Sequence, residues 1–452
     1  MTPLEKDIAM AERIADLVKH RGGEVYYVGG FVRDALLGRE NKDVDIEVHG
    51  IRPRELEEIL DALGQRLAMG DSFGVYGLRG FSLDIAMPRK ADNRGRGHAD
   101  FDSFVDPFAG TEAAAARRDL TINALMRHVL TGEIIDPFGG REDLERGIIR
   151  HVRPDTFAED PLRVLRAAQF AARFGFAVAP ETVQLCRKLE LKDLPRERVE
   201  QEIKKALLKS EKPSVFFEVL RQMDQLHDWF PEAEALIGVA QPPRHHLEGD
   251  VWNHTMLVLD EAAKLRHRTE NPFGFMLAAL CHDFGKAICS EEIDGVIHAY
   301  EHETKGLPVV EQFLRRFTRE TKLIGYVRNL TELHMKPNTM AAAGSAIKST
   351  NKLFDRAVDP EGLICIALAD NRGRYTEAPP VSHEDFLLQR LELYREFMSR
   401  PFVTGKDLLE AGLTPGKNFS EILAYAHKLR LAGVRKEEAL RHVLGHARSL
   451  KE

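Results

Sequence analysis

A chain of 452 residues is too long for a single hydrophobic core and predicts two to four domains. Its composition, 43% hydrophobic and 30% charged, is typical of a folded, water-soluble protein. The net charge of −7 argues against a surface coated for nucleic acid, although it is compatible with a local basic groove.

The sequence also gives no sign of a membrane-bound or disulfide-stabilised protein. No apolar run approaches the length that spans a membrane, and the first ten residues, "MTPLEKDIAM", lack the basic-then-apolar pattern of a signal peptide. The four cysteines, Cys186, Cys281, Cys289 and Cys365, show no C-x-x-C spacing and indicate neither a disulfide framework nor a zinc ribbon. We therefore expect a cytoplasmic protein with no membrane partner.

The predicted elements divide the chain into two parts and make it an α+β protein. Between residues 24 and 140, strand-like runs at 25–28, 44–48, 81–87 and 133–135 alternate with helical stretches and predict an α/β unit. After residue 155 strand signals nearly vanish, and amphipathic runs such as "EDPLRVLRAAQFAARFGF" predict that the rest is all-helical. Breaks rich in Pro or Gly at 238–250 and 377–385 mark candidate linkers.

The first motif, "GGFVRD", follows a predicted strand and precedes a predicted helix. In such a strand, turn and helix, the backbone N–H groups at Gly29 and Gly30 can hold a phosphate. Arg33 adds a charge-assisted donor for a triphosphate, and Asp34 either orients Arg33 or caps the helix. A Gly-Gly pair alone is weak evidence, so the motif depends on what surrounds it.

Two aspartates follow on the next predicted strand. Asp43 and Asp45 share one strand face with Glu47, while the intervening valine and isoleucine face a core. Carboxylates this close repel unless a cation lies between them, and magnesium, which also bridges to phosphates, suits such a site. Asp84, in "FSLDIAMP", is a candidate third carboxylate. The alternative is that D-x-D forms the solvated face of an edge strand.

Two arginine-bearing segments come next. The run 111–129 is predicted to be a helix, with Ile122, Leu125, Met126 and Val129 at core spacing. Arg117 and Arg118 precede this apolar stripe, where they reach a triphosphate or ribose or are simply solvated.

In the second segment, Asp160 and Pro161 begin a helix on which Arg163 and Arg166 share a face. An Asp accepts from the amine of cytosine or adenine while an Arg donates to the adjacent ring nitrogen. Uracil and guanine present a carbonyl instead, and a buried mismatch costs about 1–3 kcal/mol per unpaired group. The pair therefore suits CTP and ATP, and the alternative for Asp160 is a helix cap.

A series of histidines and aspartates lies on predicted helices further along the chain. Mixed imidazole and carboxylate ligands suit a divalent metal that activates water for phosphate-ester cleavage. Any one histidine is more often structural, but the adjacent His282–Asp283 pair favours a metal site. Lys286 and Arg374 bind the substrate phosphate or are solvated. The candidate ligands are His254, His282, Asp283, His302, His334 and Asp370.

In chain order, the motifs resemble those of the class II tRNA nucleotidyltransferases, the family of bacterial CCA-adding enzymes and poly(A) polymerases. The resemblance rests on "VGGFVRDALLG", "KDVDIEV", "LDIAMPR", "RRDLTINAL", "GEIIDPFGGREDLERGIIRHV" and "EDPLRVLRAAQFAARF", which cover most of residues 25–176. It implies a polymerase-beta-like head on a helical neck, body and tail. The implied reaction adds C and A from CTP and ATP to the 3′ end of tRNA and releases pyrophosphate.

The resemblance also implies roles for individual residues. Asp43 and Asp45 would bind the catalytic Mg²⁺, with Asp84 as a third carboxylate. Asp160 and Arg163 would be the template for the base, with Arg166 beside them. The nucleotide and its triphosphate would contact Gly29, Gly30, Arg33, Asp34, Arg117 and Arg118. Many members carry another Arg where this chain has Gln169, which puts one nucleotide contact in question.

The histidine series resembles the HD phosphohydrolase superfamily, whose pattern is H…HD…D with extra histidines in two-metal members. Some bacterial CCA-adding enzymes carry such a domain, with phosphatase, nucleotidase and 2′,3′-cyclic phosphodiesterase activities known in the family. All ligand positions are filled in this chain, which favours hydrolysis of phosphorylated 3′ ends. The identity of the metal (Mg²⁺, Mn²⁺, Ni²⁺ or Fe²⁺) stays open.

Together, these interpretations predict a catalytic head at 1–140, a base- and tRNA-binding neck and body at 141–238, an HD domain at 239–376 and a helical tail at 377–452. Enzymes that add CCA, only A, only CC or poly(A) share these motifs. The loop 89–104 is expected to set the switch from C to A. Two other hypotheses are an HD phosphohydrolase whose head only binds nucleotides and a non-catalytic RNA-binding protein. Oligomeric state is not predicted.

Overall fold

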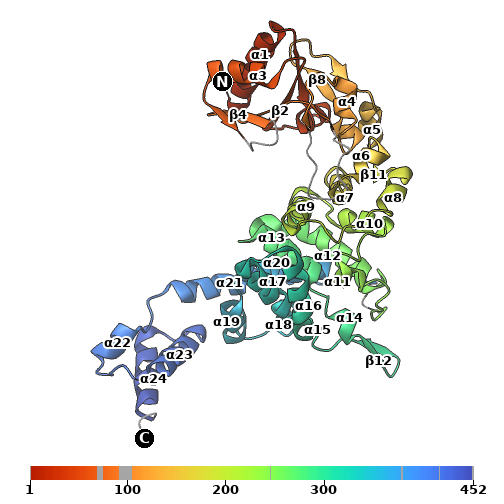
Figure 1. The fold of residues 1–452 in the computed structure, drawn as a ribbon. Coiled ribbons are helices and arrows are strands. Elements are labelled where there is room, and N and C mark those ends of the chain that lie inside the picture. Colours follow the sequence, from red (N-terminus) through yellow and green to blue (C-terminus); the bar gives the residue numbers. More distant parts are fainter. Residues whose placement is uncertain are drawn as a thin grey trace. The chain divides into compact units, whose positions relative to one another are not determined.

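The computed structural model describes residues 2–68, 75–90, 104–244, 246–377, 380–416 and 418–449 (Figure 1). It divides into two compact units. Unit 1 comprises residues 1–194 with 222–225, and unit 2 comprises residues 195–221 with 226–452. Most of the loop predicted to govern the switch from C to A, residues 91–103, lies outside the described residues.

A seven-stranded mixed sheet forms the centre of unit 1, in the order β3-β4-β5-β2-β1-β8-β9. Only β2 and β5 are parallel neighbours; the other neighbours are antiparallel. The strands are β1 Glu24–Val28, β2 Val44–His49, β3 Arg66–Ala68, β4 Val75–Leu78, β5 Leu83–Ala86, β8 Met126–His128 and β9 Ile134–Ile135.

Helices α1 (Pro3–Lys19) and α3 (Pro53–Leu63) pack together, and α1 also packs on strands β1 and β2. As the alternation in β2 predicts, Val44, Ile46 and Val48 are at most 1% exposed. The other elements of unit 1 are α2 Gly30–Leu36, β6 Arg89–Lys90, β7 Phe104–Val105, α4 Thr111–Ala115, η1 Thr121–Asn123, α5 Gly140–Arg146, β10 Ile148–Ile149, α6 Pro154–Ala158, α7 Leu162–Phe174, β11 Ala177–Val178 and α8 Pro180–Cys186.

The continuous helix predicted for 111–129 is wrong. Helix α4 ends at Ala115, a short 3₁₀ turn follows, and Met126–His128 forms strand β8 between β1 and β9. Ile122 and Leu125 are fully buried, as expected. The apolar spacing therefore identified the core residues, but pairing with the distant strand β1 and with the nearby strand β9 overrides helix propensity.

Unit 2 is largely helical. Helices α12, α13, α17 and α20 pack around a core in which every residue from Phe273 to Cys281 is buried. Its elements are α9 Arg196–Lys209, α10 Ser214–Gln222, α11 Pro231–Glu234, α12 Val251–Leu265, η2 Arg266–Arg268, α13 Pro272–Cys281, α14 Lys286–Cys289, β12 Glu291–Ile293, β13 Val296–His298, α15 His302–Lys305, α16 Leu307–Phe317, α17 Thr321–Leu333, α18 Met335–Ala342, α19 Ile347–Arg356, α20 Pro360–Arg372, α21 Glu384–Ser399, α22 Gly405–Glu410, α23 Phe419–Leu431 and α24 Lys436–Ser449.

The hairpin β12–β13 corrects the expectation that everything after residue 155 is helical. Asp294 and Gly295 form its two-residue turn, with φ angles of 50° and 78°. Positive φ at both positions is the type I′ geometry that Asp-Gly favours. The "DG" signal is visible in the sequence, but strands of three residues are too short to show alternation.

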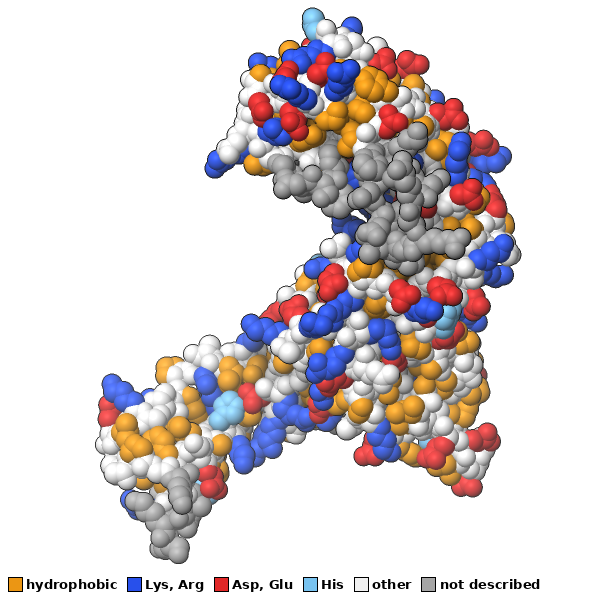
Figure 2. Space-filling model, viewed as in Figure 1, with side chains coloured by type: hydrophobic (Ala, Val, Ile, Leu, Met, Phe, Trp, Pro, Cys, Tyr) orange, Lys and Arg blue, Asp and Glu red, His pale blue; other side chains and the backbone are white. Residues whose placement is uncertain are grey.

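The last three helices have a small core of their own, which includes Leu408, Ala426, Ala439 and Val443. On the face shown in Figure 2, basic and acidic side chains are interspersed. Among the described residues, no helix is both long and apolar enough to cross a membrane. The domain boundaries predicted from the sequence remain predictions.

Candidate active sites

The first candidate site is a cluster of three carboxylates in unit 1. Asp45 lies opposite Asp84 in the parallel register of β2 and β5, and Asp43 immediately precedes β2. Burial, followed by the charge of Asp84, raises the pKa of Asp45 to about 6. Like charges placed directly opposite on neighbouring strands repel, so a divalent cation between Asp45 and Asp84 would stabilise the pair.

Asp43 is held in position by a chain of hydrogen bonds. Its backbone N–H donates to Asn41 Oδ1 at 3.0 Å, and Asn41 Nδ2 donates to Asp34 Oδ2 at 2.9 Å. Asp34 in turn accepts from Arg33 Nε at 2.8 Å, which matches the predicted orienting role of Asp34. Asn41 was missed from the sequence, because a single Asn between charged residues carries no signal of its own.

Arg33 is only 3% exposed and links α2 to α7 within unit 1. Its Nη1 donates to Asn123 Oδ1 at 2.5 Å, and its guanidinium lies 5.0 and 4.9 Å from the ring centres of Phe170 and Phe174. Such contacts stabilise the buried charge. The triphosphate contact expected of Arg33 therefore remains a prediction, whereas its packing role is visible.

A basic cavity of about 290 Å³ lies beside the carboxylates, lined by Glu47, Ala86, Met87, Arg89, Ala114, Arg117 and Arg118. Burial, together with the charges of Arg117 and Arg118, lowers the pKa of Arg89. Arg118 donates to Glu47 at 2.9 Å, while Nη1 of Arg117 is buried without a hydrogen-bond partner among the described residues. Three neighbouring guanidinium groups suit a polyanion such as a triphosphate.

The residues expected to read the base lie at the start of α7. Asp160 Oδ1 accepts from the backbone N–H of Leu162 at 3.2 Å, so the capping alternative holds in part. Arg163 donates to the carbonyl oxygen of Arg117 at 2.9 Å, which ties the start of α7 to a segment that lines the arginine cavity. Arg166 forms a pair with Asp119 at 2.7 Å, and Asp119 was missed from the sequence.

Gln169, at the position where an Arg was expected, is 1% exposed. Its Nε2 has no hydrogen-bond partner among the described residues. A buried, unpartnered amide is costly. Gln169, in place of the expected Arg, therefore leaves a polar group buried inside α7.

The second candidate site gathers the histidines and aspartates of unit 2. Two groups of ligand atoms each lie within 4.8 Å of one another: His254, His282 and Asp370 form one, and Asp283, His302 and His334 the other. All six side chains are at most 6% exposed. The structure thus brings together every residue that the sequence proposed for this site.

The ring orientations fit metal ligation. Nδ1 of His282, His302 and His334 lies 2.8, 2.9 and 2.7 Å from the carbonyl oxygens of Ala279, Ala299 and Thr331. An Nδ1–H that donates to a carbonyl leaves a lone pair on Nε2, which is the usual arrangement of a metal-ligating histidine.

These Nε2 atoms converge on Asp283, from which they lie 3.3, 3.1 and 3.9 Å away. Burial lowers the pKa of His334 to about 3, so its imidazole is neutral at physiological pH. Burial opposes ionisation of Asp283, but His282 and Lys286 hold the pKa of its carboxyl well below its usual range. Lone pairs that converge on a carboxylate fit one or two divalent cations.

Two glycines allow His302 to approach Asp283. A Cβ at Gly285 would lie 2.0 Å from the carbonyl oxygen of His302, and one at Gly306 would lie 2.7 Å from Cα of Gly285. No side chain fits at these distances without moving the backbone. Gly285 therefore sets the spacing between the segments that carry Asp283 and His302.

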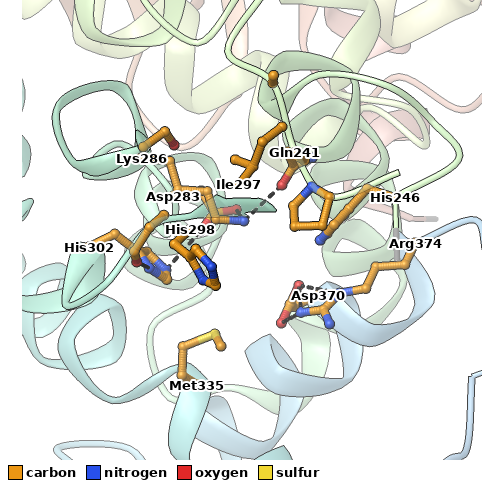
Figure 3. Close-up of a pocket in the computed structure, with 14 residues that line it drawn as sticks. Gln241, His246, Asp283, Lys286, Ile297, His298, His302, Met335, Asp370 and Arg374 are labelled. Atoms are coloured by element: carbon orange, nitrogen blue, oxygen red, sulfur yellow. Dashed lines mark hydrogen bonds and ion pairs between the residues drawn. The ribbon is translucent and has the colours of Figure 1, made fainter. Parts of the chain in front are cut away.

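Polar residues around a cavity of about 190 Å³ complete this site (Figure 3). Lys286 contacts Asp283 at 2.7 Å, and Arg374 forms an ion pair with Asp370. His246 and Glu248 were missed from the sequence; Glu248 Oε1 lies 2.7 and 3.0 Å from Nδ1 of His246 and of His254. Glu248 therefore orients a predicted ligand, a role that short sequence patterns do not reveal.

Both candidate sites lie in regions that match known protein families. Residues 25–150 match the Poly A polymerase head domain, residues 175–237 the "Probable RNA and SrmB- binding site of polymerase A", and residues 251–374 the HD domain. A multifunctional CCA protein of Pseudomonas aeruginosa is 36% identical over 92% of this chain and 99% of its own length. One of Alkalilimnicola ehrlichii is 37% identical over 86% and 94%.

The chain belongs to the multifunctional CCA protein family. Solved structures of CCA-adding enzymes share the fold: one in complex with ATP superposes with a TM-score of 0.68 at 23% identity, covering 99% of this chain and 96% of its own. Another, from Thermotoga maritima and complexed with tRNA, gives 0.65 at 22% identity over 98% of each chain. As a family member, the chain has a nucleotidyltransferase head and an HD domain, both of which generally use divalent metals.

The raised pKa of Asp45 predicts that Asp45→Asn stabilises the metal-free protein. As pH rises through the window from about 4 to 6, the unfolded chain ionises Asp45 before the folded one does, so folding stability falls. A folded pKa of about 6 against an unfolded pKa of about 3.9 corresponds to about 3 kcal/mol above pH 6. Asn removes this cost, and calorimetry of the metal-free variant should show the gain at pH 7.5 and roughly half of it at pH 5.

The matched control is Asp16→Asn, which changes an exposed aspartate on α1 of the same unit and should leave the unfolding temperature unchanged. No stabilisation by Asp45→Asn at pH 7.5 would contradict the raised pKa that burial and the charge of Asp84 give Asp45.

The close approach at Gly285 predicts that Gly285→Ala weakens metal binding in unit 2 by at least about 10-fold, because ligand geometry must shift. Titration with Co²⁺ followed by visible absorption measures this, since the bands report imidazole ligation. Gly325→Ala, at a position on α17 with no atom within 4 Å of the added Cβ, should bind like the wild type. Equal affinities of the two variants would refute the role of Gly285.

Proposed function

We propose that this protein is a tRNA nucleotidyltransferase that adds C and A residues from CTP and ATP to the tRNA 3′ end, for CCA addition and repair. The observation that carries the proposal is the set of three carboxylates beside a cavity with three arginines. The printed names of its relatives, multifunctional CCA proteins and CCA-adding enzymes in complex with ATP and with CTP, support the same activity.

In the head, Asp43 and Asp45 would hold Mg²⁺, with Asp84 as third carboxylate. The bound metal would activate the attacking hydroxyl and neutralise charge on the departing pyrophosphate. Arg117 and Arg118 would bind the triphosphate, joined by Arg33 and by the backbone N–H groups at Gly29 and Gly30. The tRNA 3′-hydroxyl then attacks the α-phosphate, a new phosphodiester bond forms, and pyrophosphate leaves.

Asp160 and Arg163 would select the base, and Arg166 would support them. The Asp160 carboxylate accepts from the amine of cytosine or adenine, and Arg163 donates to the neighbouring ring nitrogen. Support comes from the link between Arg163 and the backbone of Arg117, since it joins base-reading and triphosphate-binding segments. Asp160 and Arg163 would not make these two contacts with UTP or GTP, because uracil and guanine carry a carbonyl in place of the amine.

In unit 2, the six ligands would hold one or two divalent metals, and the site would hydrolyse phosphate esters at damaged or phosphorylated 3′ ends. The supporting observation is the set of three histidines whose Nδ1 atoms lie at hydrogen-bond distance from backbone carbonyls. Lys286 and Arg374 would bind the substrate phosphate. The metal's identity is left open between Mg²⁺, Mn²⁺, Ni²⁺ and Fe²⁺.

The proposed domains are the head at 1–140, the neck and body at 141–238, the HD domain at 239–376 and the tail at 377–452. The cytoplasmic location stays a prediction. Enzymes that add only A, only CC or poly(A) share the head motifs, but the relatives' names favour full CCA addition.

The two proposed activities should separate by mutation. Asp45→Ala removes a metal ligand of the head and should lower nucleotide incorporation at least about 1,000-fold while leaving ester hydrolysis unchanged. His282→Ala should lower ester hydrolysis and leave nucleotide incorporation unchanged. Incorporation of labelled CTP into a transcript lacking CCA, and release of phosphate from a 3′-phosphorylated oligonucleotide, measure the two. Loss of both activities in either variant, with folding intact by circular dichroism, would contradict separate sites.

Base selection should weaken when the template is removed. Asp160→Ala should lower kcat/KM for CTP and ATP by about 10- to 100-fold and narrow discrimination against UTP, because the carboxylate that repels the uracil carbonyl is gone. Single-turnover incorporation with each nucleotide gives the ratios. Asp155→Ala, at the start of α6 nearby, serves as the matched control. An unchanged CTP-to-UTP ratio would refute the proposed template.

A further inference from the structure

The cavity at the histidine and aspartate cluster of unit 2 is too small to enclose a nucleotide. Its volume of about 190 Å³ lies below the range of about 300–1,000 Å³ that is usual for enclosed small-molecule sites. Metal ligands and phosphate-binding cations line it, so the phosphate ester belongs inside. The rest of any nucleoside phosphate must therefore lie at the mouth of the cavity.

An aromatic pair lies at this mouth. His298 lines the cavity, and its ring stacks on that of Tyr300, with centres 4.9 Å apart and planes 10° apart (Figure 3 shows His298 beside Asp283 and His302). Tyr300 is 58% exposed, so much of the pair is open to solvent. His298 ends β13 and Tyr300 lies in the turn that follows, and the ring contact places the two side chains next to each other.

The hairpin β12–β13 carries His298 as its last residue, and Tyr300 follows two residues later. His298 pairs with Glu291 across the hairpin, whose turn is the Asp294–Gly295 pair. Ala299 is the residue between His298 and Tyr300 in sequence, and its carbonyl oxygen lies 2.9 Å from Nδ1 of His302. The segment that carries the rings thus also orients a proposed metal ligand.

Large apolar side chains of the hairpin and of the preceding helix α14 (Lys286–Cys289) are exposed as well. Ile288, Ile293 and Val296 are 62%, 42% and 50% exposed. Figure 2 shows hydrophobic side chains at the surface where Figure 1 places this hairpin. An exposed aromatic and aliphatic surface beside a phosphate-ester cavity fits a ligand with one flat apolar face and one anionic group.

We propose that the His298–Tyr300 pair is a stacking subsite for the nucleobase of the ester cleaved in unit 2. This inference rests on the proposed hydrolase function and deepens it. The phosphate enters the cavity, and the adjoining base stacks on the ring pair outside it. Stacking tolerates every base, because each has a π face, so the subsite distinguishes RNA ends and nucleotides from base-free phosphate esters without reading sequence.

The test compares two cyclic phosphodiesters that undergo the same ring opening, 2′,3′-cyclic CMP and the base-free glycerol 1,2-cyclic phosphate. His298→Ala and Tyr300→Ala should each lower kcat/KM for cyclic CMP about 10-fold and leave the base-free ester within about twofold. Tyr300→Phe should retain activity on both. Tyr375→Ala, which removes a similarly exposed ring (56%) outside the hairpin, should behave like the wild type.

Two results would overturn the subsite: an equal loss on both esters, which means a purely structural role, or no loss on either. A second readout does not need turnover. An oligonucleotide ending in 2-aminopurine 3′-phosphate should be quenched when its base stacks on the wild-type protein, and less so on Tyr300→Ala. If the wild type hydrolyses neither cyclic ester and also releases no phosphate from a 3′-phosphorylated oligonucleotide, the proposed hydrolase function fails. The quenching then decides alone: equal quenching by both proteins would refute the subsite.

Discussion

The burial of Asp45 opposite Asp84 is the constraint on which the first candidate site depends. These carboxylates lie opposite each other on the only parallel pair of strands in the seven-stranded sheet, and the buried branched residues of β2 fix that register. A one-residue slip would move the apolar set to the wrong face, so the core holds the charges together. The resulting site is unfavourable without a cation, and burial raises the pKa of Asp45 to about 6.

The second unit follows the same principle with different ligands. Three imidazoles are oriented by backbone carbonyls so that their Nε2 lone pairs converge on Asp283, an arrangement that is unfavourable until a metal or proton intervenes. Close backbone contacts at Gly285 and Gly306 set the spacing there. In both units, a rigid apolar scaffold holds polar groups in positions that they would not adopt alone, which is how proteins build metal sites.

Much of this could be predicted from the sequence, because periodicity and ligand chemistry are local properties. The alternation in β2 identified its buried face, and the His282–Asp283 pair led to all six clustered ligands. The wrong helix at 111–129 shows the limit: the same apolar spacing serves β8 once the distant strand β1 pairs with it. Asn41, Asp119 and Glu248 were missed, since each acts through a partner that only the fold brings near.

The most direct test of the central claim gives the purified protein tRNA transcripts that end before CCA, after C and after CC. Each is incubated with Mg²⁺ and with CTP alone, ATP alone or both, and the products are resolved at single-nucleotide length. The account predicts stepwise growth to CCA that stops at the terminal A. Extension of only the CC-ended transcript, or unlimited addition of A, would contradict full CCA addition, and no incorporation under any condition would contradict the carboxylate cluster as a nucleotidyl-transfer site.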